Sequence, residues 1–160
     1  MPYLIDGHNL IPKIPGIHLH DVEDEIQLIE ILKVFCRKTR SKAEVYFDNA
    51  PPGHRDVGRH GSVIAFFVHQ GRTADDAIRL RLKNLGRSAR NWTVVSSDRE
   101  LIAAGKESGA RWISSSKFAS KLQFQMSDQG RRQDKEKDLE LSPESVDEWL
   151  NIFGHGNKER

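Results

Sequence analysis

The chain has 160 residues, of which 37% are hydrophobic and 30% are charged, and its formal net charge is +2. This length suits one domain with a buried core, and so small a net charge does not by itself indicate a polyanionic partner. No apolar stretch approaches the roughly 20 residues that span a bilayer, and an acidic residue at position 6 comes too early for a signal peptide. The single cysteine, Cys36, excludes an internal disulfide. We therefore expect a cytoplasmic protein that has no membrane segment.

Short apolar runs alternate with helix-like stretches along the chain. Val, Ile, Phe and Tyr content predicts strands near residues 3–6, 44–48, 62–68, 92–96 and 111–113. Helical spacing of apolar residues predicts helices near 21–42, 74–85, 98–109 and 114–126. Segments 7–20 and 49–61 contain Pro and Gly and are expected to be loops. This order predicts a doubly wound α/β domain, with a mostly parallel sheet of about five strands flanked by helices.

The composition changes after residue 126. Residues 127–141 are strongly polar, which predicts a solvated linker or mobile loop. Beyond them, Ser142-Pro143 opens an amphipathic stretch that carries Trp149 and Phe153. We therefore expect a main domain over residues 1–126, and a C-terminal helix and tail over residues 142–160 that pack on it.

Four apolar runs end on an acidic residue or lead directly into one. The acidic residues are Asp6, Asp48, Asp75 and Asp98. In an open α/β sheet, ligand sites form beyond the carboxyl ends of the strands, so these four side chains are expected to gather at one edge. Carboxylates held close together repel one another unless protons or cations intervene. Oxygen ligands of this kind suit Mg²⁺ or Mn²⁺, and the pattern predicts a divalent metal site.

Each acidic residue also has a local structural explanation. Asp6 and Asn9 can hydrogen-bond a turn, although Asn9 could equally orient a water or a metal ligand. Asp48 precedes two prolines, where such residues commonly form turns. Asp98 can cap the helix that follows it, unless Ser97 takes that role and leaves Asp98 free to face the crevice.

Asp75 and Asp76 are adjacent, but the sequence predicts a different role for each. If Thr73 is the N-cap of the helix that follows, Asp76 falls at the third helical position and can complete a capping box. Asp75 has no such local role and is the better candidate for chemistry. All four acidic positions at one sheet edge are less easily explained as coincidence than any one of them alone.

Several enzyme classes lack their signatures in this chain. There is no phosphate-binding P-loop and no Gly-x-Gly-x-x-Gly turn. The first acidic residue stands in Asp6-Gly7-His8 rather than in the Asp-x-Asp of aspartyl-phosphate phosphatases. With these classes excluded, the activity that best fits an acidic metal site is metal-dependent cleavage of a phosphodiester. Cations on or near the helix after Asp75 and in the loop after Asp48 could hold a nucleic-acid backbone around the acidic centre. The main candidates are Arg55, Arg59, Arg72, Arg79 and Lys83, with Arg81, Arg87 and Arg90 on or just after the same helix.

Four segments resemble the NYN group of PIN-like nucleases, and most closely its bacterial YacP-like branch. They are Tyr3-Leu4-Ile5-Asp6-Gly7-His8-Asn9-Leu10-Ile11, Val45-Tyr46-Phe47-Asp48, Thr73-Ala74-Asp75-Asp76-Ala77-Ile78, and Val94-Val95-Ser96-Ser97-Asp98-Arg99-Glu100-Leu101. They follow the order of that family and span roughly residues 3–120. The first segment is the most specific, whereas Thr-Ala-Asp and Ser-Ser-Asp alone would be weak signals.

The resemblance implies a PIN-like Rossmannoid fold and metal-dependent endoribonuclease activity with Mg²⁺ or Mn²⁺. It carries over Asp6, Asp75 and Asp98 as the metal site and Asn9 as a supporting residue, with Asp48 and Asp76 as further ligands or as residues behind the ligands. It also implies RNA as partner, with association with the ribosome as a further implication. Two alternatives stay open: a non-catalytic RNA- or ribosome-binding module, and a small-molecule phosphohydrolase.

Overall fold

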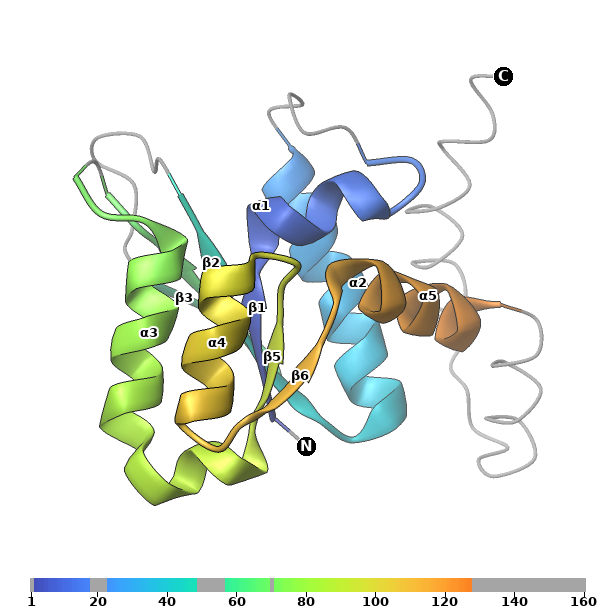
Figure 1. Cartoon of the computed structure of the whole chain (residues 1–160). Helices are drawn as coiled ribbons and strands as arrows, with labels where there is room; N and C mark the ends of the chain where they lie inside the picture. Colours follow the sequence, from blue (N-terminus) through green and yellow to red (C-terminus); the bar gives the residue numbers. More distant parts are fainter. Residues whose placement is uncertain (1, 18–22, 49–56, 70, 128–160) are drawn as a thin grey trace.

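A six-stranded sheet forms the centre of the computed structural model, which describes residues 2–17, 23–48, 57–69 and 71–127 (Figure 1). Its strand order is β3-β4-β2-β1-β5-β6. Only the β3–β4 pair is antiparallel, and the other pairs are parallel. The strands are β1 (Pro2–Asp6), β2 (Lys42–Phe47), β3 (Val57–His60), β4 (Val63–Phe67), β5 (Thr93–Val95) and β6 (Arg111–Ile113).

Helices connect the parallel strands and cover both faces of the sheet (Figure 1). They are α1 (Gly7–Leu10), α2 (Asp24–Thr39), α3 (Ala74–Leu85), α4 (Arg99–Glu107) and α5 (Ser115–Met126), with two 3₁₀ segments, η1 (Ile11–Lys13) and η2 (Gly86–Asn91). None of the described helices is long and apolar enough to cross a membrane.

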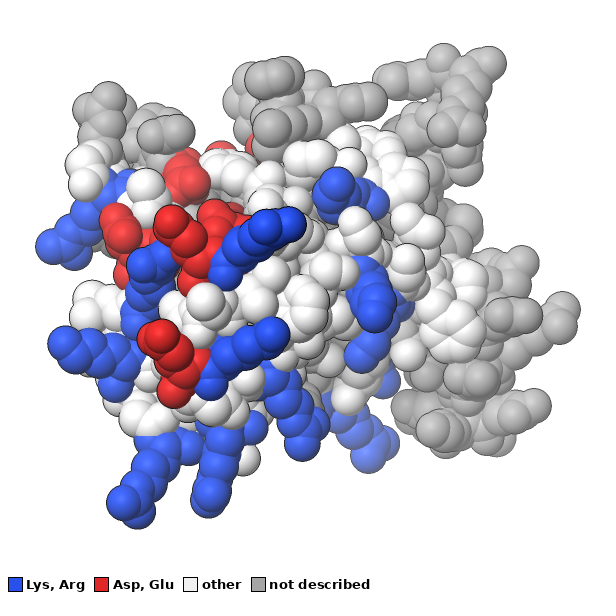
Figure 2. Space-filling view, in the orientation of Figure 1, with Lys and Arg blue, Asp and Glu red and all other residues white. Residues whose placement is uncertain are grey.

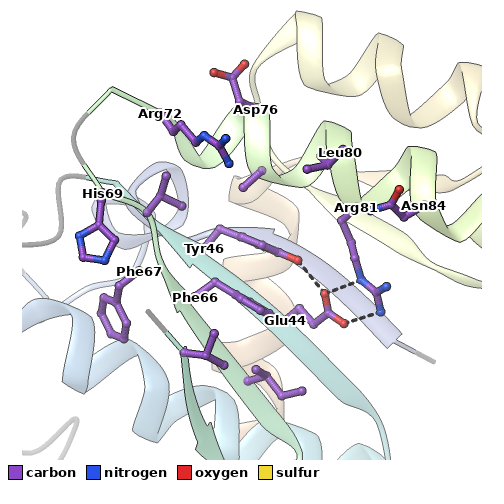
Figure 3. A pocket seen from close by; sticks show the side chains of 14 residues that line it. Glu44, Tyr46, Phe66, Phe67, His69, Arg72, Asp76, Leu80, Arg81 and Asn84 are labelled. Atoms are coloured by element: carbon purple, nitrogen blue, oxygen red, sulfur yellow. Dashed lines mark hydrogen bonds and ion pairs between the residues drawn. The ribbon is translucent and has the colours of Figure 1, made fainter. Parts of the chain in front are cut away.

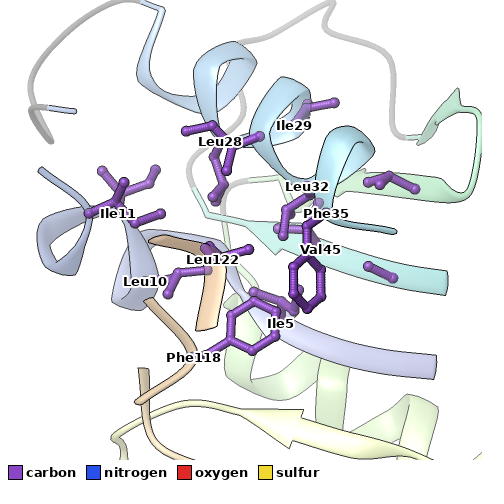
Figure 4. Close-up of a cluster of buried hydrophobic side chains, with 14 of the residues drawn as sticks. Ile5, Leu10, Ile11, Leu28, Ile29, Leu32, Phe35, Val45, Phe118 and Leu122 are labelled. Carbon is purple, nitrogen blue, oxygen red and sulfur yellow. The ribbon is translucent and has the colours of Figure 1, made fainter. Parts of the chain in front are cut away.

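The sheet separates two apolar cores. On one face, α2, α5 and the α1–η1 segment pack on Ile5 and Val45, with Phe35 and Phe118 in edge contact at a ring-centroid distance of 5.3 Å (Figure 4). On the other face, α3 and α4 pack on Leu4 and Val94. Because neighbouring strand residues point to opposite faces, each central strand supplies both cores. This accounts for continuous apolar runs in place of alternating ones.

Two predicted loops contain regular structure. Residues 7–13 form α1 and η1 because Leu10 and Ile11 are fully buried in the first core, and Pro12 is tolerated in the opening turn of η1. Within predicted loop 49–61, residues 57–60 form β3, which makes six strands rather than five. This strand turns into β4 through Gly61, whose φ of 62° suits a tight hairpin.

The remaining predictions of elements agree with the structure, with ends shifted by a few residues. The helix expected from residue 21 begins at Asp24, and the last strand, 111–113, matches β6. The linker 127–141, apart from its first residue, and the C-terminal segment 142–160 lie outside the described residues.

Candidate functional site

Asp6 ends the central strand β1, which lies between β2 and β5. Its carboxyl group is mostly buried, and its pKa is raised from 3.8 to about 6, first by burial and next by the charge of Asp48. The charge of Asp75 raises this pKa further, while a hydrogen bond from the backbone of Asn9 lowers it. The charge of His8 lowers this pKa as well, but burial and the neighbouring acids outweigh it, so the ionised form of Asp6 is disfavoured.

Gly7 allows α1 to begin directly over the end of β2. A Cβ atom at this position would lie 2.4 Å from Cε1 of Phe47 and 3.0 Å from the carbonyl oxygen of Tyr46, so any side chain would collide with both. The next residue, His8, accepts a hydrogen bond at Nδ1 from the Asp48 backbone N–H (3.2 Å), and its Nε2 lies 3.4 Å from Glu25 Oε1. Gly7 thus brings His8 next to Asp48.

His8 was not among the predicted site residues. Its two contacts connect the end of β2 with the first turn of α2. Only its position, directly after the Asp6-Gly7 turn, could have signalled this.

Asp48 and Asp75 lie where the end of β2 meets the start of α3. Asp48 Oδ1 accepts a hydrogen bond from the Ala74 backbone N–H. Thr73 is the N-cap of α3 as predicted, because its hydroxyl accepts from the Asp76 N–H at 3.1 Å. Asp75 Oδ2 lies 2.9 Å from Nε of Arg79. Its other oxygen, Oδ1, is buried and finds no hydrogen-bond donor among the described residues.

Asp98 caps α4. Its Oδ1 accepts from the backbone N–H groups of Glu100 (2.8 Å) and Leu101 (3.4 Å), so the structure decides against Ser97 as the cap. The Ser97 hydroxyl instead accepts from the Ser115 N–H at 3.2 Å. Asp98 can therefore contribute to a site only in addition to its capping role.

Asn9 ties three segments together rather than facing solvent. Its Oδ1 accepts from the Ser97 backbone N–H (2.9 Å) and from the fully buried Ser115 hydroxyl (2.5 Å). These bonds join the turn after β1 to the end of β5 and the start of α5. Asn9 therefore holds the turn after β1 in place at this edge.

The acidic residues form two overlapping groups. Asp6 is in electrostatic contact with Asp48 and Asp75, and Asp75 is in contact with Asp98 and Asp76. Burial is the main cause that raises the pKa of Asp75, and the neighbouring acids add to it while Arg79 opposes it. We call this set of five carboxylates, Asp6, Asp48, Asp75, Asp76 and Asp98, the acidic edge.

No three His, Cys, Asp or Glu side chains of the described residues are close enough to form a ready-made metal site. The chemistry of the acidic edge nevertheless suits a hard divalent cation. Asp75 Oδ1 is a buried acceptor without a donor, and Asp6 is a buried carboxyl whose ionised form is disfavoured. A bound cation would satisfy both groups.

The predicted RNA-binding cations fall in different places. Arg79 pairs with Asp75 and, through Nη2, with Glu100 (3.1 Å), so it belongs to the acidic edge. Arg72 and Arg59 are exposed, on the approach to α3 and on β3 respectively. Lys83 lies in the last turn of α3, at the far end of that helix from Asp75. Arg55 lies outside the described residues.

A groove of about 910 Å³ lies beside the acidic edge, between α3 and the β4 side of the sheet (Figure 3). Its floor contains Phe66 stacked on Tyr46 at a centroid distance of 4.7 Å. Glu44 is buried there and accepts from the Tyr46 hydroxyl (2.7 Å) and from two nitrogens of Arg81 (3.0 and 2.9 Å). These bonds fix α3 against β2 and so determine where Asp75 and Asp76 lie.

The family model that describes the YacP-like NYN domain matches residues 3–153. The chain belongs to the YacP-like NYN domain family. This is a nuclease-type family, and the PIN-like nuclease domains to which it is related generally use divalent metals. The match extends beyond the four segments that carried the resemblance, to a part of the C-terminal region that no motif had covered.

Two crystal structures of Rae1 (YacP) from Bacillus subtilis are similar to this chain. The W164L mutant gives a TM-score of 0.61 at 22% identity, with 100% of each chain covered. The other structure gives a TM-score of 0.63 at 20% identity, with 99% of this chain and 97% of that chain covered. Among curated protein sequences none matches significantly. The similarity confirms the PIN-like fold that was expected for this YacP-like NYN domain.

Proposed function

We propose that this YacP-like NYN domain is a metal-dependent endoribonuclease whose active site is the acidic edge. The observation that supports this most directly is the state of Asp6 and Asp75. Asp6 is a mostly buried carboxyl with its pKa raised to about 6, and Asp75 has a buried oxygen that no donor of the described residues reaches. Both lie at the carboxyl ends of the parallel strands, where α/β folds form their ligand sites. Groups left uncompensated in this way mark functional sites more often than structural ones.

Asp6, Asp75 and Asp98 would hold the cation, Mg²⁺ or Mn²⁺, directly or through water, with Asp48 and Asp76 behind them. When bound, the metal would supply an activated water and charge neutralisation at the scissile phosphate. The chain's own residues prepare this site. Asn9 fixes the turn that carries Asp6, the Ala74 N–H orients Asp48, and the Glu100 and Leu101 N–H groups hold one oxygen of Asp98.

RNA is the proposed substrate because the family is nuclease-type and because cations flank the acids. Arg72 is exposed on the approach to α3 and can contact a phosphate. Arg59 is exposed too, but it pairs with Ile64 near the start of β4 and so lies away from the acids. Arg79 forms an ion pair with Asp75. When a metal ion binds Asp75 instead, the Arg79 side chain becomes free to contact a phosphate. The proposal includes messenger RNA engaged with a ribosome as the substrate, and it places the protein in the cytoplasm.

The test is cleavage of an RNA with both single-stranded and structured parts, in Mg²⁺ or Mn²⁺. The wild type is compared with Asp6→Asn and Asp75→Asn, which keep size and hydrogen bonding but remove a charge. We expect each substitution to slow cleavage by at least about 100-fold, the usual cost of losing a group that stabilises charge in the transition state. Glu107→Gln is the matched control, because Glu107 is exposed at the opposite end of α4.

A non-catalytic RNA- or ribosome-binding module is the second candidate. It predicts no cutting of free or ribosome-bound RNA, and equal RNA binding by the wild type and both Asp variants. If both Asp6→Asn and Asp75→Asn cleave RNA as fast as the wild type, the acidic edge is not the active site.

A further inference from the structure

Exposed cations gather at the end of the molecule opposite the acidic edge. In this fold the five parallel strands all start, and α2, α3 and α4 all finish, at that end, where β3 also finishes. Figure 2 shows Lys and Arg side chains projecting along the lower rim, while Asp and Glu side chains cluster higher on the same face. We call this set the basic end: Arg40, Lys42, Lys83, Arg87, Arg90, Lys106 and Arg111, all exposed.

The two ends are well separated. β1 has five residues and α3 has twelve, so about 15–18 Å of strand or helix lies between them. The net charge of only +2 therefore conceals a strongly polarised molecule. Glu107 is an acidic residue that falls among the cations, at the end of α4.

Helix dipoles explain only part of the basic end. Lys83 and Lys106 lie in the last turns of α3 and α4, where cations are favourable without any partner. Lys42 and Arg111 begin strands instead, and Arg87 and Arg90 lie in the 3₁₀ segment η2. Their accumulation at the same end needs another explanation.

Several of these cations have no ion-pair partner in the part of the chain that the structure describes. No described acidic side chain forms an ion pair with Arg40, Lys42, Lys83, Arg87 or Arg90. By contrast, Arg79 and Arg81, which precede Lys83 in α3, form ion pairs with Asp75 and Glu44 respectively. The unpaired cations come from α2, β2, α3 and η2, so they form a broad surface rather than one helix stripe.

The composition of the basic end favours a polyanion over a protein partner. Protein interfaces are usually built around apolar and aromatic anchors. Of the five large apolar side chains that are exposed in the described residues, Ile26, Val57 and Phe124 lie in α2, β3 and α5. Leu80 lies one helical turn before Lys83 in α3, and Trp112 follows Arg111 in β6, with Lys106 Nζ 5.6 Å from its ring centroid. The basic end thus carries seven cations but few apolar anchors. A surface of separated Lys and Arg side chains fits the phosphates of a folded nucleic acid.

We propose that the basic end is a second RNA-binding surface, which holds the phosphate backbone of folded RNA while the acidic edge remains free to act on a strand. Binding of RNA at the basic end requires neither a metal nor catalysis. It is therefore expected whether or not the acidic edge is a nuclease site.

The test measures binding of the full-length protein to an RNA duplex of about 16 base pairs, in EDTA and over a range of salt concentrations. The variant combines Lys83→Gln, Arg87→Gln and Arg90→Gln. Its control combines Lys13→Gln, Lys117→Gln and Lys121→Gln, which removes the same charge from exposed positions elsewhere. The slope of log K against log salt is negative, and each lost phosphate contact reduces its magnitude by about 0.9. We therefore expect this magnitude to fall by about 2–3 for the variant and by less than about 1 for the control.

A second variant, Arg40→Gln with Lys42→Gln, draws on different elements and is expected to reduce the magnitude of the slope by about 1–2. Equal slopes in the variants and the control would overturn the proposal. So would a loss of binding to vesicles of anionic phospholipid with no loss of duplex binding, because the basic end would then face a membrane. Cleavage of a short single-stranded RNA by the triple variant reports separately on the acidic edge.

Discussion

At the scale of single residues, the acidic edge is a set of carboxylates that the fold leaves short of positive charge. Asp6 is largely buried beside Asp48, and Asp75 has one oxygen without a donor. Arg79 is the one cation whose ion pair to Asp75 is seen among the described residues, and Glu100 shares it. Such a site costs stability in the absence of a ligand and gains stability when a cation binds.

Asp6→Asn is expected to stabilise the metal-free protein at neutral pH. Because the folded-state pKa is raised from 3.8 to about 6, the folded state holds the proton more tightly than the unfolded state. Wild-type stability therefore falls as the pH rises from about 4 to about 6, whereas asparagine does not titrate. We expect urea unfolding in EDTA to show that the free energy of unfolding of the variant, relative to that of the wild type, rises by up to about 3 kcal/mol between about pH 4 and pH 8.

Mn²⁺ should reverse this order at neutral pH, because it can stabilise only the protein that retains the carboxylate. A difference in free energy of unfolding that stays constant with pH, and that Mn²⁺ does not change, would contradict the burial of an uncompensated Asp6.

At the scale of elements, helix starts and strand ends hold the acids in place through backbone hydrogen bonds. The ends of β1 and β2 meet the first turns of α3 and α4, and each helix start provides free N–H groups. Asp48 accepts from the start of α3, and Asp98 accepts from the start of α4. The same carboxylates accept structural hydrogen bonds and are proposed to bind the metal. A useful substitution must therefore remove one of these two roles and keep the other.

Asp98→Asn and Asp98→Ala separate capping from chemistry. Asparagine caps helices about as well as aspartate, whereas alanine costs about 1 kcal/mol at this position. We expect Asp98→Asn to keep the unfolding free energy close to that of the wild type, and Asp98→Ala to lower it. Both variants should lose cleavage equally, and full cleavage by Asp98→Asn would show that Asp98 is a cap alone.

Arg81→Leu is expected to loosen α3 from the sheet. It would leave Glu44, whose side chain is only 8% exposed, with the Tyr46 hydroxyl as its remaining hydrogen-bond donor among the described residues. Removing one partner of a buried pair costs about 3–5 kcal/mol, and the partial exposure of Arg81 reduces this to about 2 kcal/mol. Urea unfolding measures the loss. The double variant Glu44→Gln/Arg81→Leu should recover part of it, and a loss that does not recover would mean that Arg81 acts through its contact with Trp92.

At the scale of the whole molecule, the sequence predicted the layers of the fold better than its edges. The buried strands β1, β2, β4 and β5 were recognisable because parallel strands covered on both faces are apolar throughout. The edge strand β3, Val57-Gly58-Arg59-His60, has one large apolar residue and gave no such signal. The α1–η1 segment was missed because its glycine and its proline resemble a loop, although its apolar side chains are buried.

The candidate site shows the same division. The acidic positions were predicted from their place at strand ends, because topology alone brings such positions to one edge. The contacts of His8, the hydrogen bonds of Asn9 and the cap formed by Asp98 depend on distances between segments far apart in the chain. The separation of charge between the two ends was also hidden, because the net charge of +2 averages over it.

The measurement that tests the central claim most directly is the rate of RNA cleavage across a Mn²⁺ titration, with Mn²⁺ binding followed by calorimetry on the same protein. We predict that the rate is negligible in EDTA, that it rises over the same concentration range in which Mn²⁺ binds, and that Asp75→Asn loses both. Cleavage at full rate in EDTA, or Mn²⁺ binding that Asp75→Asn leaves unchanged, would contradict a metal-dependent nuclease site at the acidic edge.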